Sequence, residues 1–290
     1  MDIEKILDRY HSNLKDTIFK EIMHYEILES FFKLKDIQNT LIFQGGTALR
    51  LCYNNDRYSE DLDFAIHKDR EFNKEFIDYF KAIFIEKIIQ KYNLQAEIIE
   101  PKDYKINNRV QRWSARVYLP NNHKKAKINI KIANIPSHYN NFKPLKNNYE
   151  ELIDKRIFVQ VEELEEILAD KIIALSQRPY LKFRDLWDIE WLRNNRVVIN
   201  YELINLKIQD YKCENFVESL QTRRVELDNA NDTRLENDFL NEMSRFLDSE
   251  YFEQIKNIHF FSHIQKTILR EIDDILGYLN EKNLNIRRQR

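Results

Sequence analysis

Two aspartates separated by one residue are the strongest candidates for chemistry in this sequence. Asp61 and Asp63 alternate with the apolar residues Leu62 and Phe64. If the segment is a strand, both carboxylates project from one face while the apolar side chains point into the core. Neighbouring carboxylates repel each other unless a cation joins them, and Mg²⁺ is commonly held by one or two carboxylates together with phosphate oxygens. The pair therefore predicts a divalent-metal site.

A glycine pair shortly before these aspartates predicts an anion site. The chain has three glycines, and two of them are Gly45 and Gly46. They follow an apolar run at 41–43 that is typical of a buried strand, and Thr47 opens a helical segment. Glycine permits a positive φ or the close approach of a ligand, and a helix N-terminus directs N–H groups at one point. We expect Gly45, Gly46 and Thr47 to cradle phosphates.

Each motif also has an ordinary structural explanation. A Gly-Gly pair is usually a turn, and an Asp-x-Asp sequence usually lies in a solvated loop. The combination is more specific than either motif, because the strand, the turn, the helix and the spacing agree. We therefore take residues 41–66 as the candidate site around which the chain is organised.

Together the two motifs resemble the AbiEii/AbiGii toxin family of nucleotidyltransferases, within the DNA polymerase β-like superfamily. The resemblance is carried by Gly45-Gly46-Thr47-Ala48-Leu49 and by Arg57-x-Ser59-x-Asp61-Leu62-Asp63-Phe64. It implies an α+β fold in which helices flank a small mixed sheet, and a Gly-Gly turn at the triphosphate of an NTP. It also implies that Asp61 and Asp63 bind the metal ions and that Arg57 and Ser59 steady the loop at the nucleotide site.

The predicted strand at 125–133 departs from the pattern of the superfamily. Its isoleucines face one side, and Lys127, Asn129 and Lys131 face the other. In many polymerase β-like nucleotidyltransferases a third carboxylate on this strand completes the metal site, and the best-matching position here is Asn129. Either the acidic role lies elsewhere, or metal binding and chemistry are weakened. Asparagine can ligate a metal through its oxygen but brings no charge.

A second block of candidate residues lies on two predicted helices. Lys171 falls on the apolar face of the helix at 162–178, where a charge without a partner is costly. A lysine that extends its amine to solvent from the edge of that face explains the pattern equally well. By resemblance, Lys171 lies at the active site and faces the triphosphate.

The next helix places Asp185 and Asp188 within an apolar stripe. The alternative is that acidic residues simply favour a helix N-terminus. By resemblance to an Arg-Asp-x-x-Asp block, Asp185 is a catalytic-site carboxylate. It would act as general base for the acceptor hydroxyl or hold Lys171 in place, while Asp188 would support the structure.

The remaining sequence supplies the elements that position these residues. Periodicity predicts two helices within 2–38, an amphipathic helix at 70–92, and strands at 94–99, 110–119, 125–133 and 156–161. Residues 134–155, with two prolines and several asparagines, predict a long exposed loop over a sheet edge. From residue 196 onward the pattern is helical. We expect a nucleotidyltransferase domain at 1–195, followed by a C-terminal helical bundle domain at 196–290.

Composition limits the partners. The formal net charge is −2, so any RNA contact depends on a local basic patch. Cys52 and Cys213 match no metal-binding spacing, and we interpret both as reduced cysteines of a cytosolic protein. The sequence begins without the apolar region of a signal peptide, and no run approaches the roughly 18 apolar residues of a membrane span. We expect a cytoplasmic protein without a membrane partner.

These observations lead to one leading hypothesis and two alternatives. The leading hypothesis is a nucleotidyltransferase, dependent on Mg²⁺ or Mn²⁺, that transfers NMP from an NTP to an acceptor hydroxyl. The resemblance implies a toxin with a cognate antitoxin and an RNA acceptor, with the 3′ end of tRNA as the first candidate. The first alternative is transfer to a small molecule or a protein. The second is a degenerate member that binds a nucleotide or a partner without turnover.

Overall fold

The structure is a computed structural model that describes residues 2–10, 14–73, 75–101, 110–119, 125–152, 156–228 and 233–288. It divides into two compact units, Met1–Glu163 and Leu164–Arg290. Residues 164–195, predicted from the sequence to be part of the nucleotidyltransferase domain, therefore belong to the second compact unit. The division of function between 1–195 and 196–290 stays a prediction.

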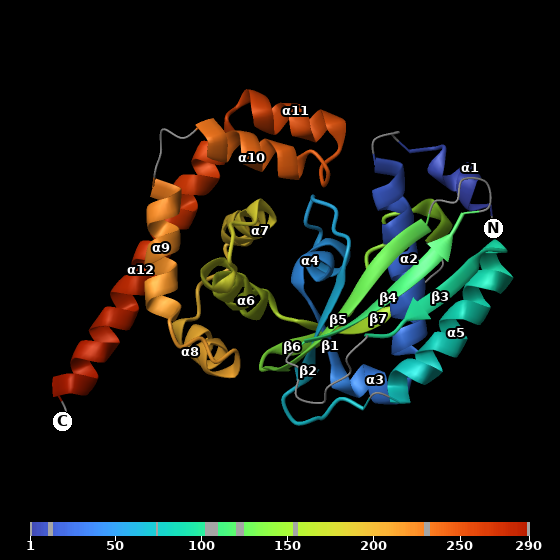
Figure 1. Cartoon of the computed structure of the whole chain (residues 1–290), viewed down its shortest axis with the longest axis horizontal. Coiled ribbons are helices and arrows are strands. Elements are labelled where there is room, and N and C mark those ends of the chain that lie inside the picture. The colour runs from blue at the N-terminus through green and yellow to red at the C-terminus, as the bar shows by residue number, and fades with distance from the viewer. Residues whose placement is uncertain are drawn as a thin grey trace. The chain divides into compact units, whose positions relative to one another are not determined.

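The first unit is built on a seven-stranded mixed sheet with the order β3-β4-β5-β2-β1-β7-β6 (Figure 1). β2 runs antiparallel to β1 and parallel to β5, while β1 runs parallel to β7. The strands are β1 (Leu41–Gln44), β2 (Leu62–His67), β3 (Gln95–Ile99), β4 (Val110–Tyr118), β5 (Lys125–Ser137), β6 (Asn140–Pro144) and β7 (Phe158–Glu162). The candidate residues 61–63 thus belong to a central strand and the residue just before it.

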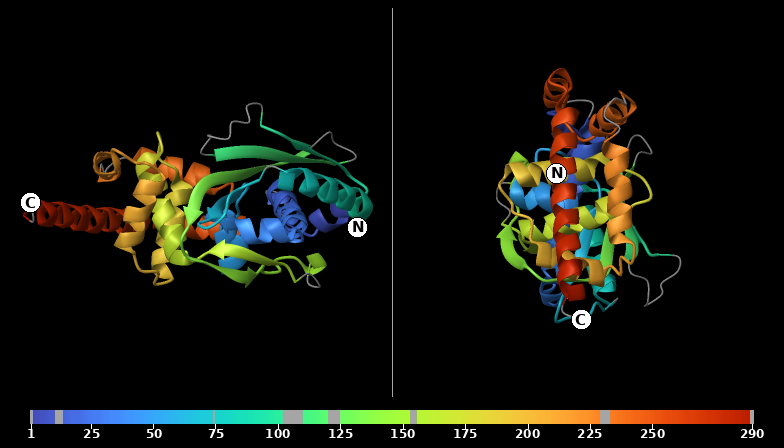
Figure 2. Two further views of the ribbon diagram at one scale, coloured as in Figure 1. Left: turned by 90° about the horizontal axis from the view of Figure 1, so that it is seen from below. Right: turned by 90° about the vertical axis from the view of Figure 1, so that its left-hand side faces the viewer.

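The helices of this unit follow from apolar residues at helical spacing. They are α1 (Ile3–Leu7), α2 (Lys15–Phe32), α3 (Lys35–Thr40), α4 (Gly45–Tyr53), α5 (Glu75–Tyr92) and a single 3₁₀ turn at Glu150–Leu152. α2 packs against α5, β5 and β7, and α5 packs against β3 (Figure 2). Phe31, Phe64 and Phe80 are fully buried where these elements meet. The ring centroids of Phe31 and Phe80 lie 4.0 Å apart, so this contact joins α2 to α5.

The prediction of a long loop at 134–155 is wrong for the first half of that segment. β5 continues to Ser137 after its register with β2 shifts between Phe64 and Ile66. β6 then forms the edge of the sheet, antiparallel to β7. Pro136 follows the register shift and Pro144 ends the edge strand, the two places in a sheet where a missing N–H is tolerated. The prolines therefore indicated an irregular strand and an edge, not the absence of strands.

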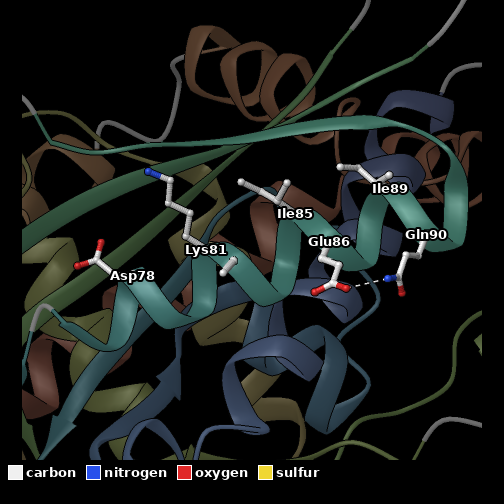
Figure 3. Close-up of a pocket in the computed structure, with 7 residues that line it drawn as sticks. Asp78, Lys81, Ile85, Glu86, Ile89 and Gln90 are labelled. Carbon is white, nitrogen blue, oxygen red and sulfur yellow. Dashed lines mark hydrogen bonds between the residues drawn. The ribbon is translucent and has the colours of Figure 1, made fainter.

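An open hollow lies along one side of α5. Figure 3 shows Lys81, Ile85 and Ile89 projecting from one side of the helix, while Glu86 and Gln90 point to the other. The side chains of Glu86 and Gln90 are joined by a hydrogen bond of 2.8 Å. None of the residues predicted to form the active site lines this hollow.

The second unit is helical throughout the part that the structure describes. Its helices are α6 (Leu164–Gln177), α7 (Phe183–Asn194), α8 (Tyr201–Asp210), α9 (Phe216–Asp228), α10 (Thr233–Met243), α11 (Ser249–Asn257) and α12 (Phe260–Arg288). α6 packs against α7, α8 and α9, and the long α12 packs against α7 and α9 (Figure 2). Trp187 and Phe239 are buried between these helices. Mixed sheet and helices together confirm the predicted α+β class.

The described residues also bear on membrane insertion. None of the helices in that part of the chain combines the length and apolarity that crossing a membrane would need.

Candidate active site

The two aspartates predicted to bind metal lie side by side at the start of β2. Leu62 and Phe64 are fully buried, whereas the side chains of Asp61 and Asp63 are 30% and 34% exposed. The alternation of β2 therefore turns both carboxylates away from the core, as the sequence pattern indicated. Both acidic side chains are therefore partly exposed to solvent.

The Gly-Gly turn lies directly against this acidic pair. β1 pairs with β2 so that Gln44 is opposite Asp63, and Gly45 follows with a φ of +79°. A Cβ atom on Gly45 would lie 3.1 Å from Asp63 Oδ2, and a Cβ on Gly46 would collide with the guanidinium of Arg57. Glycine is needed at both positions, since one has a left-handed backbone and the other touches a buried side chain. The turn thus brings the N-terminus of α4 next to Asp63.

The loop between α4 and β2 is tied to both elements. Thr47 is buried and its hydroxyl donates a hydrogen bond to the carbonyl of Asp61. Arg57 is buried as well and donates from its guanidinium to the carbonyl of Tyr58 at 2.9 Å. Ser59 is 8% exposed. The Thr47 hydroxyl is engaged within the loop, so the N–H groups at the start of α4, which have no partner within the helix, are the donors suited to a phosphate.

Residues of α2 support this loop from the core side. His24 Nε2 lies 3.0 Å from the carbonyl oxygen of Glu60, and Lys20 Nζ lies 2.6 Å from the Glu60 carboxylate. Burial lowers the pKa of His24 below its usual value, so the ring is neutral at pH 7 and donates to that carbonyl. These two contacts fix the residue that immediately precedes Asp61.

A lysine with no role predicted from the sequence joins the two aspartates. Lys131 of β5 is opposite Asp63 in the parallel register of β2 and β5. Its Nζ lies 2.6 Å from Asp61 Oδ2 and 3.3 Å from Asp63 Oδ1. Burial alone would lower the pKa of Lys131, but the carboxylates of Asp63 and Asp61 raise it above its usual value. Lys131 therefore remains a cation between two anions.

Asn129 lies at the same acidic pair but offers its amide nitrogen. Its Nδ2 donates to Asp61 Oδ1 at 2.8 Å, and its Oδ1 accepts a hydrogen bond from Ser114 at 3.0 Å. Among the residues that the structure describes, no third acidic, histidine or cysteine side chain joins Asp61 and Asp63 to form a metal-binding group. Of the two explanations for Asn129, relocation of the third carboxylate finds no support in that part of the chain.

The acidic pair nevertheless fits a hard divalent cation. Its donors are carboxylate oxygens on one face of a strand, and a positive group already bridges them in the form of Lys131. Mg²⁺ keeps much of its hydration and needs only one or two carboxylates when phosphate oxygens complete its coordination. The N-terminus of α4 beside Asp63 provides for such phosphates.

The second unit contains a buried charge cluster around Lys171 of α6. The side chain of Lys171 is 9% exposed, and its Nζ lies 3.0 Å from Asp185 Oδ1 and 2.6 Å from Asp188 Oδ2. Arg178 Nε lies 3.0 Å from Asp185 Oδ2. The lysine is thus buried with two partners and does not extend into solvent from the edge of the helix. Asp188, expected to support structure, binds Lys171 more closely than Asp185 does.

A further charge cluster of three residues fixes α6 just before Lys171. Lys207 of α8 is fully buried, and its Nζ lies 2.6 Å from Glu166 Oε1 and 3.2 Å from Asp170 Oδ2. Neither Lys207 nor Arg178 was singled out from the sequence, because their partners lie on other helices or beyond a turn. The acidic pair with Lys131 belongs to the first compact unit, and the Lys171 cluster belongs to the second.

Comparisons with known proteins place the chain among nucleotidyltransferases. The family model "Nucleotidyl transferase AbiEii toxin, Type IV TA system" matches residues 26–258. The solved structure of a putative nucleotidyltransferase from H. pylori is similar with a TM-score of 0.52 and 19% identity, over 91% of this chain and 97% of that chain. The nucleotidyltransferase toxin MenT4 from Mycobacterium tuberculosis H37Rv is similar with a TM-score of 0.51 and 16% identity, over 96% and 97%. A comparison with curated proteins gives no match.

Proposed function

The chain belongs to the AbiEii family of nucleotidyltransferase toxins of type IV toxin–antitoxin systems, and we propose that it transfers a nucleoside monophosphate from an NTP to a hydroxyl of RNA. The 3′ end of tRNA is the first candidate acceptor. In the reaction, the acceptor oxygen forms a bond to the α-phosphorus, the bond to the β-phosphate breaks, pyrophosphate leaves and the hydroxyl proton is lost. Membership of the family also implies a cognate antitoxin as a partner.

The observation that carries this proposal is the contact between the Gly-Gly turn and the acidic pair. The hypothetical Cβ of Gly45 lies 3.1 Å from Asp63 Oδ2, so backbone N–H groups suited to phosphates and carboxylates suited to a metal adjoin one small volume. A nucleotidyltransferase must bring these two functions together, since its substrate is a triphosphate and catalysis consists of positioning and charge neutralisation.

A divalent cation completes the proposed site. Asp61 and Asp63 would hold Mg²⁺ or Mn²⁺, and the metal would supply neutralising charge at the phosphate oxygens. The chain's own residues do the rest: the start of α4 binds the phosphates, and Thr47 holds the Asp61 backbone. Arg57 packs beneath Gly46 and so keeps the turn against β2.

In the second unit, Lys171 is the residue that the resemblance to the family assigns to nucleotide binding, and this assignment stays a prediction. Asp185 has both of its oxygens engaged, Oδ1 with Lys171 and Oδ2 with Arg178. Of the two roles expected for Asp185, its contacts favour holding Lys171 in place over general-base catalysis.

One observation favours a second candidate function. Asn129 and Lys131 stand on the strand where a third carboxylate completes the site in other superfamily members, and both donate to Asp61. A degenerate chain that binds nucleotide without turnover would tolerate these residues. The proposed experiment therefore measures transfer and nucleotide binding separately.

The experiment uses purified protein, Mg²⁺ or Mn²⁺, each α-labelled NTP in turn and total RNA. We expect the wild type to label an RNA band and the Asp61→Asn/Asp63→Asn variant to lose at least 100-fold of this activity. Asp69→Asn, which removes an exposed carboxylate beyond the end of β2, is the matched control and should label RNA like the wild type.

Two other results would contradict the proposal in different ways. Label that enters protein or a small molecule when RNA is omitted would move the acceptor to another class. Thermal stabilisation by an NTP without labelled product or pyrophosphate, in all metals and with all four nucleotides, would favour the degenerate binder. Equal unfolding temperatures of the wild type and the double variant in EDTA would exclude misfolding as the cause of lost activity.

A further inference from the structure

We propose that Lys131 is a built-in cation of the acidic site, so that Asp61 and Asp63 take up one divalent metal ion where a three-carboxylate site would hold two. This inference rests on the proposed function, because it assumes a divalent metal at this pair. Lys131 would thus be a positioning residue whose ammonium group neutralises the carboxylate of Asp61.

The first support is the number of carboxylate oxygens that the protein already uses. Lys131 binds Asp61 Oδ2 and Asp63 Oδ1, and Asn129 donates to Asp61 Oδ1. Three of the four oxygens therefore accept bonds from β5. The fourth, Asp63 Oδ2, is the oxygen that faces Gly45. The oxygen least engaged by β5 thus points to the phosphate cradle, where a metal bound together with an NTP would be needed.

The second support is the fixed position of Lys131. It is opposite Asp63 in the register of two adjacent central strands, and Ile130 and Ile132 on either side of it are buried in the core. The strand cannot rotate to remove Lys131 without exposing these isoleucines, so the backbone of Lys131 is held beside the acidic pair. Lys127 on the same face of β5 is exposed, whereas Lys131 is partly buried; each has an arginine of β4 opposite it, Arg116 for Lys127 and Arg112 for Lys131.

The third support is the balance of charge. Two carboxylates and one ammonium leave a single negative charge at the site. A second divalent ion would have to approach Lys131 as well as the first metal, and like charges a few ångströms apart repel strongly where water is partly excluded. The same balance explains how two adjacent carboxylates are stable in the folded chain before any metal binds.

The test counts bound Mn²⁺ by the EPR signal of the free ion. Four variants accompany the wild type: Lys131→Met, Lys131→Arg, the matched control Lys127→Met, and Asp61→Asn/Asp63→Asn. We expect one bound Mn²⁺ per chain in the wild type, in Lys131→Arg and in Lys127→Met. The double variant should bind no Mn²⁺. We expect Lys131→Met to bind a second Mn²⁺, or to bind the first at least tenfold more tightly.

A thermal measurement provides a second readout that does not depend on activity. In EDTA, Lys131→Met should unfold at a temperature about 3 °C or more below that of Lys127→Met. Added Mn²⁺ should raise the unfolding temperature of Lys131→Met and so remove this difference. A general structural role of Lys131 would lower the unfolding temperature without recovery by Mn²⁺. If Lys131→Met is poorly folded, Lys131→Gln serves in its place.

The outcomes separate this inference from the proposed function. Equal number and affinity of Mn²⁺ in Lys131→Met and Lys127→Met, with binding still lost in the double variant, would overturn the role of Lys131 and leave the metal site standing. No binding in any protein would overturn both. Binding in Lys131→Met but not in the wild type would overturn the inference that the natural site takes up one metal ion, and it would contradict metal dependence of the natural chain.

Discussion

The two compact units each use a lysine to join two aspartates, and the two clusters differ in depth. The side chains of Lys131, Asp61 and Asp63 are 24%, 30% and 34% exposed, whereas those of Lys171, Asp185 and Asp188 are 9%, 5% and 0% exposed. An ion pair that water reaches can exchange partners at low cost, while a buried pair is held by the cost of leaving a charge alone. The cluster of Lys131, Asp61 and Asp63 is therefore suited to exchange its ion-pair partners. The cluster of Lys171, Asp185 and Asp188 is suited to hold the Lys171 side chain in place.

The largest expected effect tests this difference in depth directly. Asp188→Ala removes a fully buried partner of Lys171, and we expect it to lower the free energy of unfolding by about 3–5 kcal/mol. Asp63→Ala removes a partly exposed partner of Lys131 and should change it by no more than about 1 kcal/mol. Urea unfolding followed by circular dichroism measures both, with Asp238→Ala on the exposed side of α10 as the control. Equal losses in the two clusters would refute the contrast.

An intermediate effect is expected at the Gly-Gly turn. Gly45→Ala places a side chain at a φ of +79° and within 3.1 Å of Asp63 Oδ2, and should cost about 1–2 kcal/mol of stability. It should also reduce nucleotide transfer, because the turn would shift away from β2. Gly277→Ala is the matched control: no atom lies within 4 Å of its Cβ and the residue is helical, so it should stabilise by up to about 1 kcal/mol. Loss of stability in both variants would count against a special role of the turn.

The smallest effect concerns pH and the support beneath the exposed cluster. Burial lowers the pKa of His24, so below pH 6.5 the unfolded chain binds a proton that the folded chain does not. The contribution of His24 to the free energy of unfolding is therefore fully present above about pH 6.5. It falls as the pH drops towards the lowered pKa, by at most about 1.4 kcal/mol per pH unit. Unfolding curves between pH 7.5 and about 5.5 should show this slope in the wild type.

The matched variants for this measurement are His24→Gln and His259→Gln. His24→Gln should flatten the slope, whereas His259→Gln, which removes an exposed ring in the second unit, should leave it unchanged. A slope that persists in His24→Gln would assign the pH dependence to other groups.

Local patterns were sufficient to predict the acidic pair and the turn. Asp61 and Asp63 share a face because strand side chains alternate, and Leu62 and Phe64 need a core on the other side. The left-handed backbone at Gly45 likewise follows from a strand that turns at once into a helix. Both features depend only on residues that are adjacent in the sequence.

The partners of these residues could not be predicted in the same way. Lys131 and Asn129 lie on the same face of β5, and only the parallel register with β2 decides which of them is opposite Asp63. The two ion pairs of Asp185 similarly depend on how α7 packs against the end of α6. Register and helix packing are set by contacts between distant segments, on which the period of one segment carries no information.

The glycine pair also has a genetic consequence. Every missense change in a glycine codon introduces a side chain, and at positions 45 and 46 that side chain would meet either a carboxylate or a buried guanidinium. Two adjacent codons are thus a compact target at which any amino-acid replacement disturbs the proposed nucleotide site. Point mutations that change the amino acid at either codon are therefore expected to reduce toxicity.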